Sequence, residues 1–154
     1  MNKVCGFLVV GILCTMTVNL YLYYKHHQIT NFSCQGSTTV KDESYTLNAK
    51  ISFSLSGDVG QSIVNGELID TEGSVHSVHR SSSFRFKQNG NSFYVTNYSV
   101  VALPKNSVDQ STLKKFLPPF LVFKGISTHV GIYPLSRHGY LITGDEYTHF
   151  VCEK

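Results

Sequence analysis

The sequence predicts a mainly β fold with one short helix, preceded by a single N-terminal transmembrane helix. Three observations predict it. An uncharged apolar run fills residues 4–24, strict alternation of apolar and polar residues fills 45–56, and tight-turn signals such as Asn89-Gly90 separate the later segments. About six to eight strands follow one another as an antiparallel meander. The residues alone do not distinguish an open sheet from a sandwich or a partial barrel.

The run from Val4 to Tyr24 has the length and composition of a membrane anchor. Its roughly 21 residues would form a helix of about 31 Å, which matches the hydrocarbon thickness of a bilayer. The alternative is a cleaved signal peptide, but the run contains no Ala and ends in tyrosines, and Leu13 before Cys14 argues against a lipoprotein signal. The residues assigned to the anchor are Val4, Phe7, Leu8, Val9, Ile12, Leu13, Leu20, Tyr21, Leu22, Tyr23 and Tyr24.

Three residues of the anchor suggest contact with a second helix. Gly11 and Thr15 stand four apart, a spacing typical of small-residue helix pairing, and Asn19 can hydrogen-bond to a neighbouring helix. The alternative is that these residues are merely tolerated near the interface.

Two cysteines set the expected compartment. The basic residues on the two sides of the anchor, Lys3 and Lys25, hardly discriminate orientation, whereas Cys34 and Cys152 form an even pair outside the anchor. We expect them to form a disulfide in an oxidising compartment, where it stabilises the fold by about 4–5 kcal/mol in the chain-entropy model. Two unrelated free thiols are the alternative. The expected organisation is a cytoplasmic tip (1–3), a transmembrane helix (4–24), a stem (25–43) and an exported β-rich domain (44–154).

The pattern beyond residue 44 predicts each element in turn. Segment 45–56 has its apolar residues in period two, which is typical of a strand with one buried face. Ser107 and Gln110 resemble a capping box that begins a short helix, and Pro118-Pro119 end it. The expected strands are 45–56, 61–70, 74–87, 92–103, one or two within 120–134, and 140–152; the expected turns are 57–60, 71–73, 88–91 and 135–139.

No residue pattern indicates catalysis, a cofactor or a metal site, and we expect a protein that is not an enzyme. His76 and His79 stand three apart on a strand, which places them on opposite faces, and Asp145 and Glu146 diverge for the same reason. The remaining histidines, His26, His27, His129, His138 and His149, are scattered.

Charge argues against nucleic-acid binding. Of the 13 Lys and Arg residues only Lys3 and Lys25 precede residue 28, and all 10 acidic residues follow it, so the exported part is nearly neutral. Its many Phe and Tyr residues are expected in the core, with an apolar ligand cavity as the alternative.

The layout resembles the FidL-like inner-membrane proteins of enteric bacteria. The resemblance lies in the short tip, the single anchor, the cysteine in "NFSCQG", a β-rich domain and the cysteine in "HFVCEK". It implies a ToxR-like membrane-bound transcription regulator with a winged-helix domain as partner, and a lipocalin-like barrel that two exported domains complete and that accepts bile-salt-like molecules. Cys34 and Cys152 are the only positions that the resemblance carries across.

The expected function is therefore that of a single-pass accessory protein of the bacterial inner membrane. Its N-terminus is cytoplasmic, and its periplasmic domain binds and stabilises or modulates a ToxR-like regulator, with a possible small amphipathic ligand such as a bile salt. The alternatives are a stand-alone periplasmic ligand-binding sensor domain and an envelope assembly accessory factor.

Overall fold

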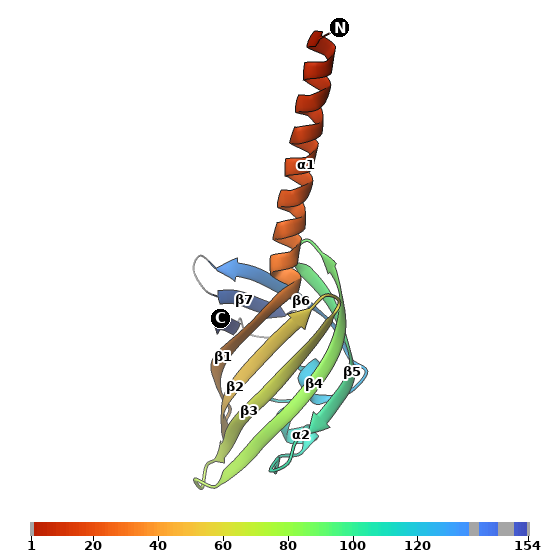
Figure 1. Ribbon diagram of the computed structural model, residues 1–154. Helices are drawn as coiled ribbons and strands as arrows, with labels where there is room; N and C mark the ends of the chain where they lie inside the picture. Colours follow the sequence, from red (N-terminus) through yellow and green to blue (C-terminus); the bar gives the residue numbers. More distant parts are fainter. Residues whose placement is uncertain (1, 136–138, 145–149, 154) are drawn as a thin grey trace.

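The computed structural model describes residues 2–135, 139–144 and 150–153, with one long helix followed by a β-barrel. Helix α1 (Asn2–Thr30) projects from one end of the barrel (Figure 1). The strands are β1 (Asn31–Lys41), β2 (Tyr45–Ser56), β3 (Val59–Asp70), β4 (Val75–Asn89), β5 (Ser92–Ala102), β6 (Ser127–Leu135), β7 (Gly139–Gly144) and β8 (Phe150–Glu153). The fold is thus mainly β with an apolar N-terminal helix, as the sequence predicts.

The strands close a barrel in chain order from β1 to β8, and every neighbouring pair is antiparallel. This settles the choice that the sequence leaves open. Long ladders join β1 to β2, β2 to β3, β3 to β4 and β4 to β5, whereas β7 and β8 are short. The tight turn at Asn89-Gly90, where Gly90 has a φ of 63°, joins β4 to β5 as expected.

Alternate residues of the strands place apolar side chains in the barrel interior. In β2 the apolar residues from Leu47 to Leu55 are buried, and the residues between them are more exposed. The same inward register in β4 and β5 buries Phe84, Phe86, Phe93 and Val95. These side chains form one continuous core because successive residues of a strand point to opposite faces.

Residues 25–43 do not form the expected stem. Helix α1 continues past Tyr24 to Thr30, and β1 begins at the next residue. The polar composition of β1 hides its alternation of buried and exposed residues. Phe32 and Cys34 are buried, and Ser33 between them is exposed. The barrel therefore starts at Asn31 and is joined to α1 without a linker.

The segment between β5 and β6 lies partly inside the barrel. It contains two short helices, α2 (Gln110–Leu113) and α3 (Pro119–Val122), and we call residues 110–126 the plug. The predicted capping box at Ser107 is wrong: Asp109 is the N-cap of α2, and Ser107 instead hydrogen-bonds to Ser77 of β4. Pro119 ends no helix but occupies the first turn of α3, where its fixed φ is favourable.

Candidate functional site

The barrel has a seam in the half that is distant from α1. Among the described residues, β1 pairs with β8 only at Gln35 and Glu153, although β1 continues to Lys41. On the other side, β6 pairs with β7 only from Val130 onwards. Residues 37–41 of β1 and 127–128 of β6 thus border the seam, and within the described part of the chain the ladders of β8 and β7 do not extend to them. A strand edge that lacks a neighbouring strand is a template for a further strand.

An apolar pocket of about 80 Å³ lies beneath the seam. Its walls come from β1, β2, β6, β7 and β8, and the plug forms its floor. The apolar lining residues are Val40, Ile51, Phe53, Phe116, Leu117, Pro118, Phe120, Leu121, Val130, Ile142 and Phe150. A deeper cavity of about 20 Å³ shares four of these residues. Pockets for drug-sized ligands measure about 300–1,000 Å³, so side chains fill most of this barrel.

Three buried polar residues hold the plug. Arg80 Nη2 donates to the carbonyl of Val122 at 3.0 Å, and Ser82 Oγ donates to the carbonyl of Phe120 at 3.1 Å. Asn97 is 1% exposed; its Nδ2 donates to the carbonyls of Phe120 and Phe123 at 2.5 and 2.6 Å. Its Oδ1 also accepts hydrogen bonds from the amides of residues 125 and 126. These bonds satisfy backbone groups of the plug, and those of Phe120 and Val122 belong to buried residues.

Arg80 carries a charge into this interior. It is 2% exposed, and burial lowers the pKa of its guanidinium. Within the described part of the chain no carboxylate forms an ion pair with it, and its Nε has no hydrogen-bond partner. Among the described residues, the plug carbonyl of Val122 accepts the hydrogen bond of this side chain.

The period-two alternation of β4 and β5 could have identified these three residues, although their polar side chains do not suggest burial. Arg80 and Ser82 lie in the inward register of Phe84 and Phe86, and Asn97 lies in that of Phe93. Polar residues in a buried register require partners, which here are the plug carbonyls.

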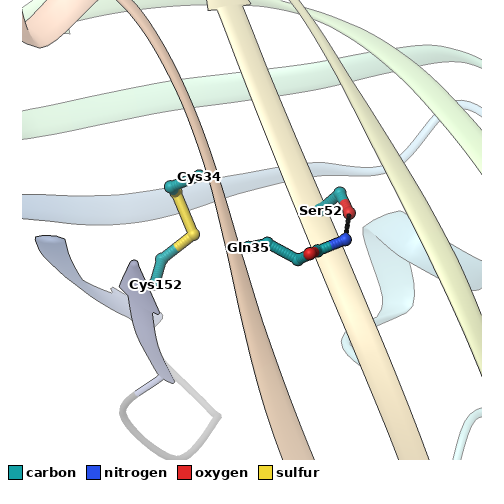
Figure 2. The surroundings of a disulfide bond; sticks show 4 residues. All are labelled: Cys34, Gln35, Ser52 and Cys152. Atoms are coloured by element: carbon teal, nitrogen blue, oxygen red, sulfur yellow. Dashed lines mark hydrogen bonds between the residues drawn. A yellow bond between two sulfur atoms is a disulfide. The ribbon is translucent and has the colours of Figure 1, made fainter. Parts of the chain in front are cut away.

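The two cysteines outside α1 form a disulfide (Figure 2). It joins β1 to β8 across 118 residues of sequence, with a Cα–Cα distance of 5.4 Å, and both cysteines are buried. Beside it, Gln35 donates a hydrogen bond to Ser52 of β2 on the outer face. The disulfide therefore fastens the barrel at the place where β1 and β8 share a single residue pair.

The anchor residues lie on α1, whose stretch Gly6–Tyr24 is long and apolar enough to cross a membrane. The side chain of Val4 lies outside the described residues; the other anchor residues, Phe7, Leu8, Val9, Ile12, Leu13, Leu20, Tyr21, Leu22, Tyr23 and Tyr24, are exposed.

The three candidate pairing residues also lie on α1. Gly11 has no atom of another element within 4 Å of its Cβ position, and Asn19 Nδ2 donates to the carbonyl of Thr15 at 2.7 Å.

The histidines and acids do not converge. His76 lies 3.6 Å from Asp70, whose pKa is lowered first by the backbone N–H of Ser74, and His79 lies 3.0 Å from Asn65. The described residues contain no group of three His, Cys, Asp or Glu side chains suited to a metal ion. The remaining candidates His138, Asp145, Glu146 and His149, and the side chains of His26 and His27, lie outside the described residues.

Comparison with known proteins covers the whole barrel. No curated protein matches the chain. Residues 31–152 match the family model described as the YqeJ C-terminal domain, and this range runs from the first residue of β1 to the disulfide cysteine of β8. The match spans most of the 154 residues. The chain therefore belongs to the YqeJ C-terminal domain family.

Proposed function

We propose that this protein is a membrane-anchored accessory protein, without catalytic activity, whose barrel binds the exported domain of a membrane-bound transcription regulator. The observation that carries the proposal is the seam. Residues 37–41 of β1 and 127–128 of β6 offer strand edges that no described residue pairs across the seam, over an apolar pocket. A strand or hairpin from a partner would gain backbone hydrogen bonds at the edges and bury apolar side chains in the pocket.

The anchor and the disulfide support the proposed location. An apolar helix that leads directly into the barrel suits a single-pass protein, and a buried disulfide persists in an oxidising compartment such as the periplasm. We place the N-terminus in the cytoplasm and the barrel in the periplasm, at the bacterial inner membrane.

The resemblance to FidL-like proteins supports the identity of the partner, a ToxR-like regulator with a winged-helix domain. Such a regulator has a single span, so the two proteins would also meet within the bilayer. Gly11, Thr15 and Asn19 lie along one side of α1, because residues four apart are neighbours on a helix. We assign them to this helix pairing.

Site-specific photocrosslinking tests the seam. A photoreactive phenylalanine analogue replaces Thr39, an exposed residue on the β1 edge, in cells that co-express the regulator. The matched control replaces Asn65, an exposed residue of β3 that is paired with β2 on one side and β4 on the other. We expect an adduct with the regulator from position 39 and none from position 65. The absence of a regulator adduct at both positions argues against the proposal.

A second candidate function is binding of an apolar ligand, which the pocket beneath the seam favours. A bile salt exceeds the volume of about 80 Å³, so it requires displacement of the plug. Asn97→Ala, which removes the hydrogen bonds that Asn97 makes to the plug, should then strengthen bile-salt binding measured by calorimetry. Undetectable binding to both wild type and variant would exclude this candidate.

A further inference from the structure

The end of β6 departs from the alternation of buried and exposed residues seen in β2. Its last three residues, Tyr133, Pro134 and Leu135, are all exposed. Tyr133 is 43% exposed and Leu135 is 44% exposed. Three consecutive exposed apolar residues are unusual on a soluble surface and indicate contact with another apolar phase. We call residues 133–135 the β6 tip.

The β6 tip lies near the base of α1. Pro134 pairs with Tyr140 of β7, and the ring of Tyr140 stacks on Phe32 with centroids 3.9 Å apart. Phe32 is the second residue of β1 and follows Thr30, the last residue of α1. Figure 1 accordingly shows β6 ending at the end of the barrel from which α1 projects.

The length of α1 places this end of the barrel close to the bilayer. Between the end of the candidate span at Tyr24 and the start of β1, the helix continues only through residues 25–30. Those residues rise by about 9 Å. The headgroup layer on each side of a membrane is about 5–8 Å thick. A tilt of about 20°, which is the average for transmembrane helices, lowers one side of the barrel further.

From this geometry we propose that the β6 tip rests in the headgroup layer of the bilayer that α1 spans. The inference rests on the proposed membrane anchorage, and its occupant is the lipid surface. Leu135 supplies apolar area, and Tyr133 is a side chain that favours membrane interfaces because its ring is apolar and its hydroxyl is polar.

A second contact with the bilayer fixes the rotation of the barrel about α1. The seam lies in the other half of the barrel, because β1 runs from Asn31 beside α1 to Lys41 and β6 runs from residue 127 towards its tip. Docking of the tip therefore holds the seam away from the lipid at a constant height, where a partner domain can reach it.

Fluorescence quenching tests the inference directly, because the chain contains no tryptophan. Single variants Leu135→Trp and Tyr133→Trp are reconstituted as the full chain into nanodiscs with lipids brominated near the headgroup end of the acyl chain. Tyr24→Trp at the end of the span reports anchorage. Val101→Trp is the matched control, since Val101 is 51% exposed and lies near the end of β5 that is distant from α1.

We expect strong quenching at position 24, quenching with a blue-shifted emission at 135, weaker quenching at 133, and none at 101. If positions 135 and 133 behave like 101 while 24 is quenched, the inference fails and the anchorage stands. If position 24 is not quenched, the anchorage fails and the inference falls with it. Equal quenching at 101 and 135 also overturns the inference, because the barrel would then lie on the membrane without a preferred side.

Discussion

Removal of the Cys34–Cys152 disulfide should destabilise the barrel more than any single core substitution. The disulfide joins residues 118 apart in sequence. In the chain-entropy model a closed loop of this length corresponds to about 5 kcal/mol at 25 °C. The loss also acts on the native state, because β1 and β8 share only the Gln35–Glu153 pair among the described residues. Without the covalent link, we expect β8 to detach before the remaining ladders open.

Urea unfolding in detergent micelles, followed by near-ultraviolet circular dichroism, measures this effect. The oxidised protein is compared with the reduced protein, which keeps both cysteines in place, and with the double variant Cys34→Ala/Cys152→Ala. Cys14→Ser is the matched control, because Cys14 is a free, exposed cysteine in α1. We expect a large fall in the unfolding midpoint for the reduced and double-variant proteins and none for the control. Equal midpoints for oxidised and reduced protein would refute the reasoning.

Three further predictions concern the plug, the β1–β8 contact and the α2 cap. Asn97→Ala should destabilise the barrel by about 3 kcal/mol in urea unfolding, because it leaves buried plug backbone groups without partners, whereas Ser99→Ala on the same strand should have little effect. Gly36→Ala should cost about 1–3 kcal/mol in the same assay, since the added Cβ would clash with the carbonyl oxygen of Val151. An unchanged midpoint would show that β8 does not pack as described. The hydroxyls of Ser111 and Thr112 lower the pKa of Asp109 to about 2. The stabilisation that the ionised Asp109 carboxylate gives the folded protein is therefore complete above the unfolded-state pKa of about 4. It is lost as pH falls through about 2. The Asp109→Asn variant should lack this pH dependence, and a pH profile identical to that of wild type would contradict the assignment.

Local sequence patterns were sufficient to predict the strands β2 to β5. The alternation in 45–56, the turn after Gly57 and the Asn89-Gly90 turn all correspond to observed elements, because each depends on residues that are neighbours in the chain. The pairing of Cys34 with Cys152 could also be proposed from the sequence, since these are the two cysteines that follow the apolar anchor.

The missed elements depend on contacts between distant segments. Closure of the barrel joins β1 to β8, and no local pattern encodes that pairing. The apolar run at residues 120–123 resembles a strand, but Asn97 and its neighbours on β4 hold it as the α3 turn inside the barrel. The sequence does not predict strand β1, because small and polar residues such as Gly36 and Thr38 occupy its inward positions. Gly36 leaves space for the ring of Phe150, and Thr38 lines the pocket.

Hydrogen–deuterium exchange of the amides in residues 37–41, with and without the regulator that we propose as the partner, tests the central claim most directly. We expect the amides of this stretch that point away from β2 to exchange rapidly in the free protein and to become strongly protected in the complex, while amides in the fully paired β3 remain unchanged. A stable complex in which residues 37–41 exchange as fast as in the free protein would contradict the account, because the partner would then bind elsewhere than at the seam.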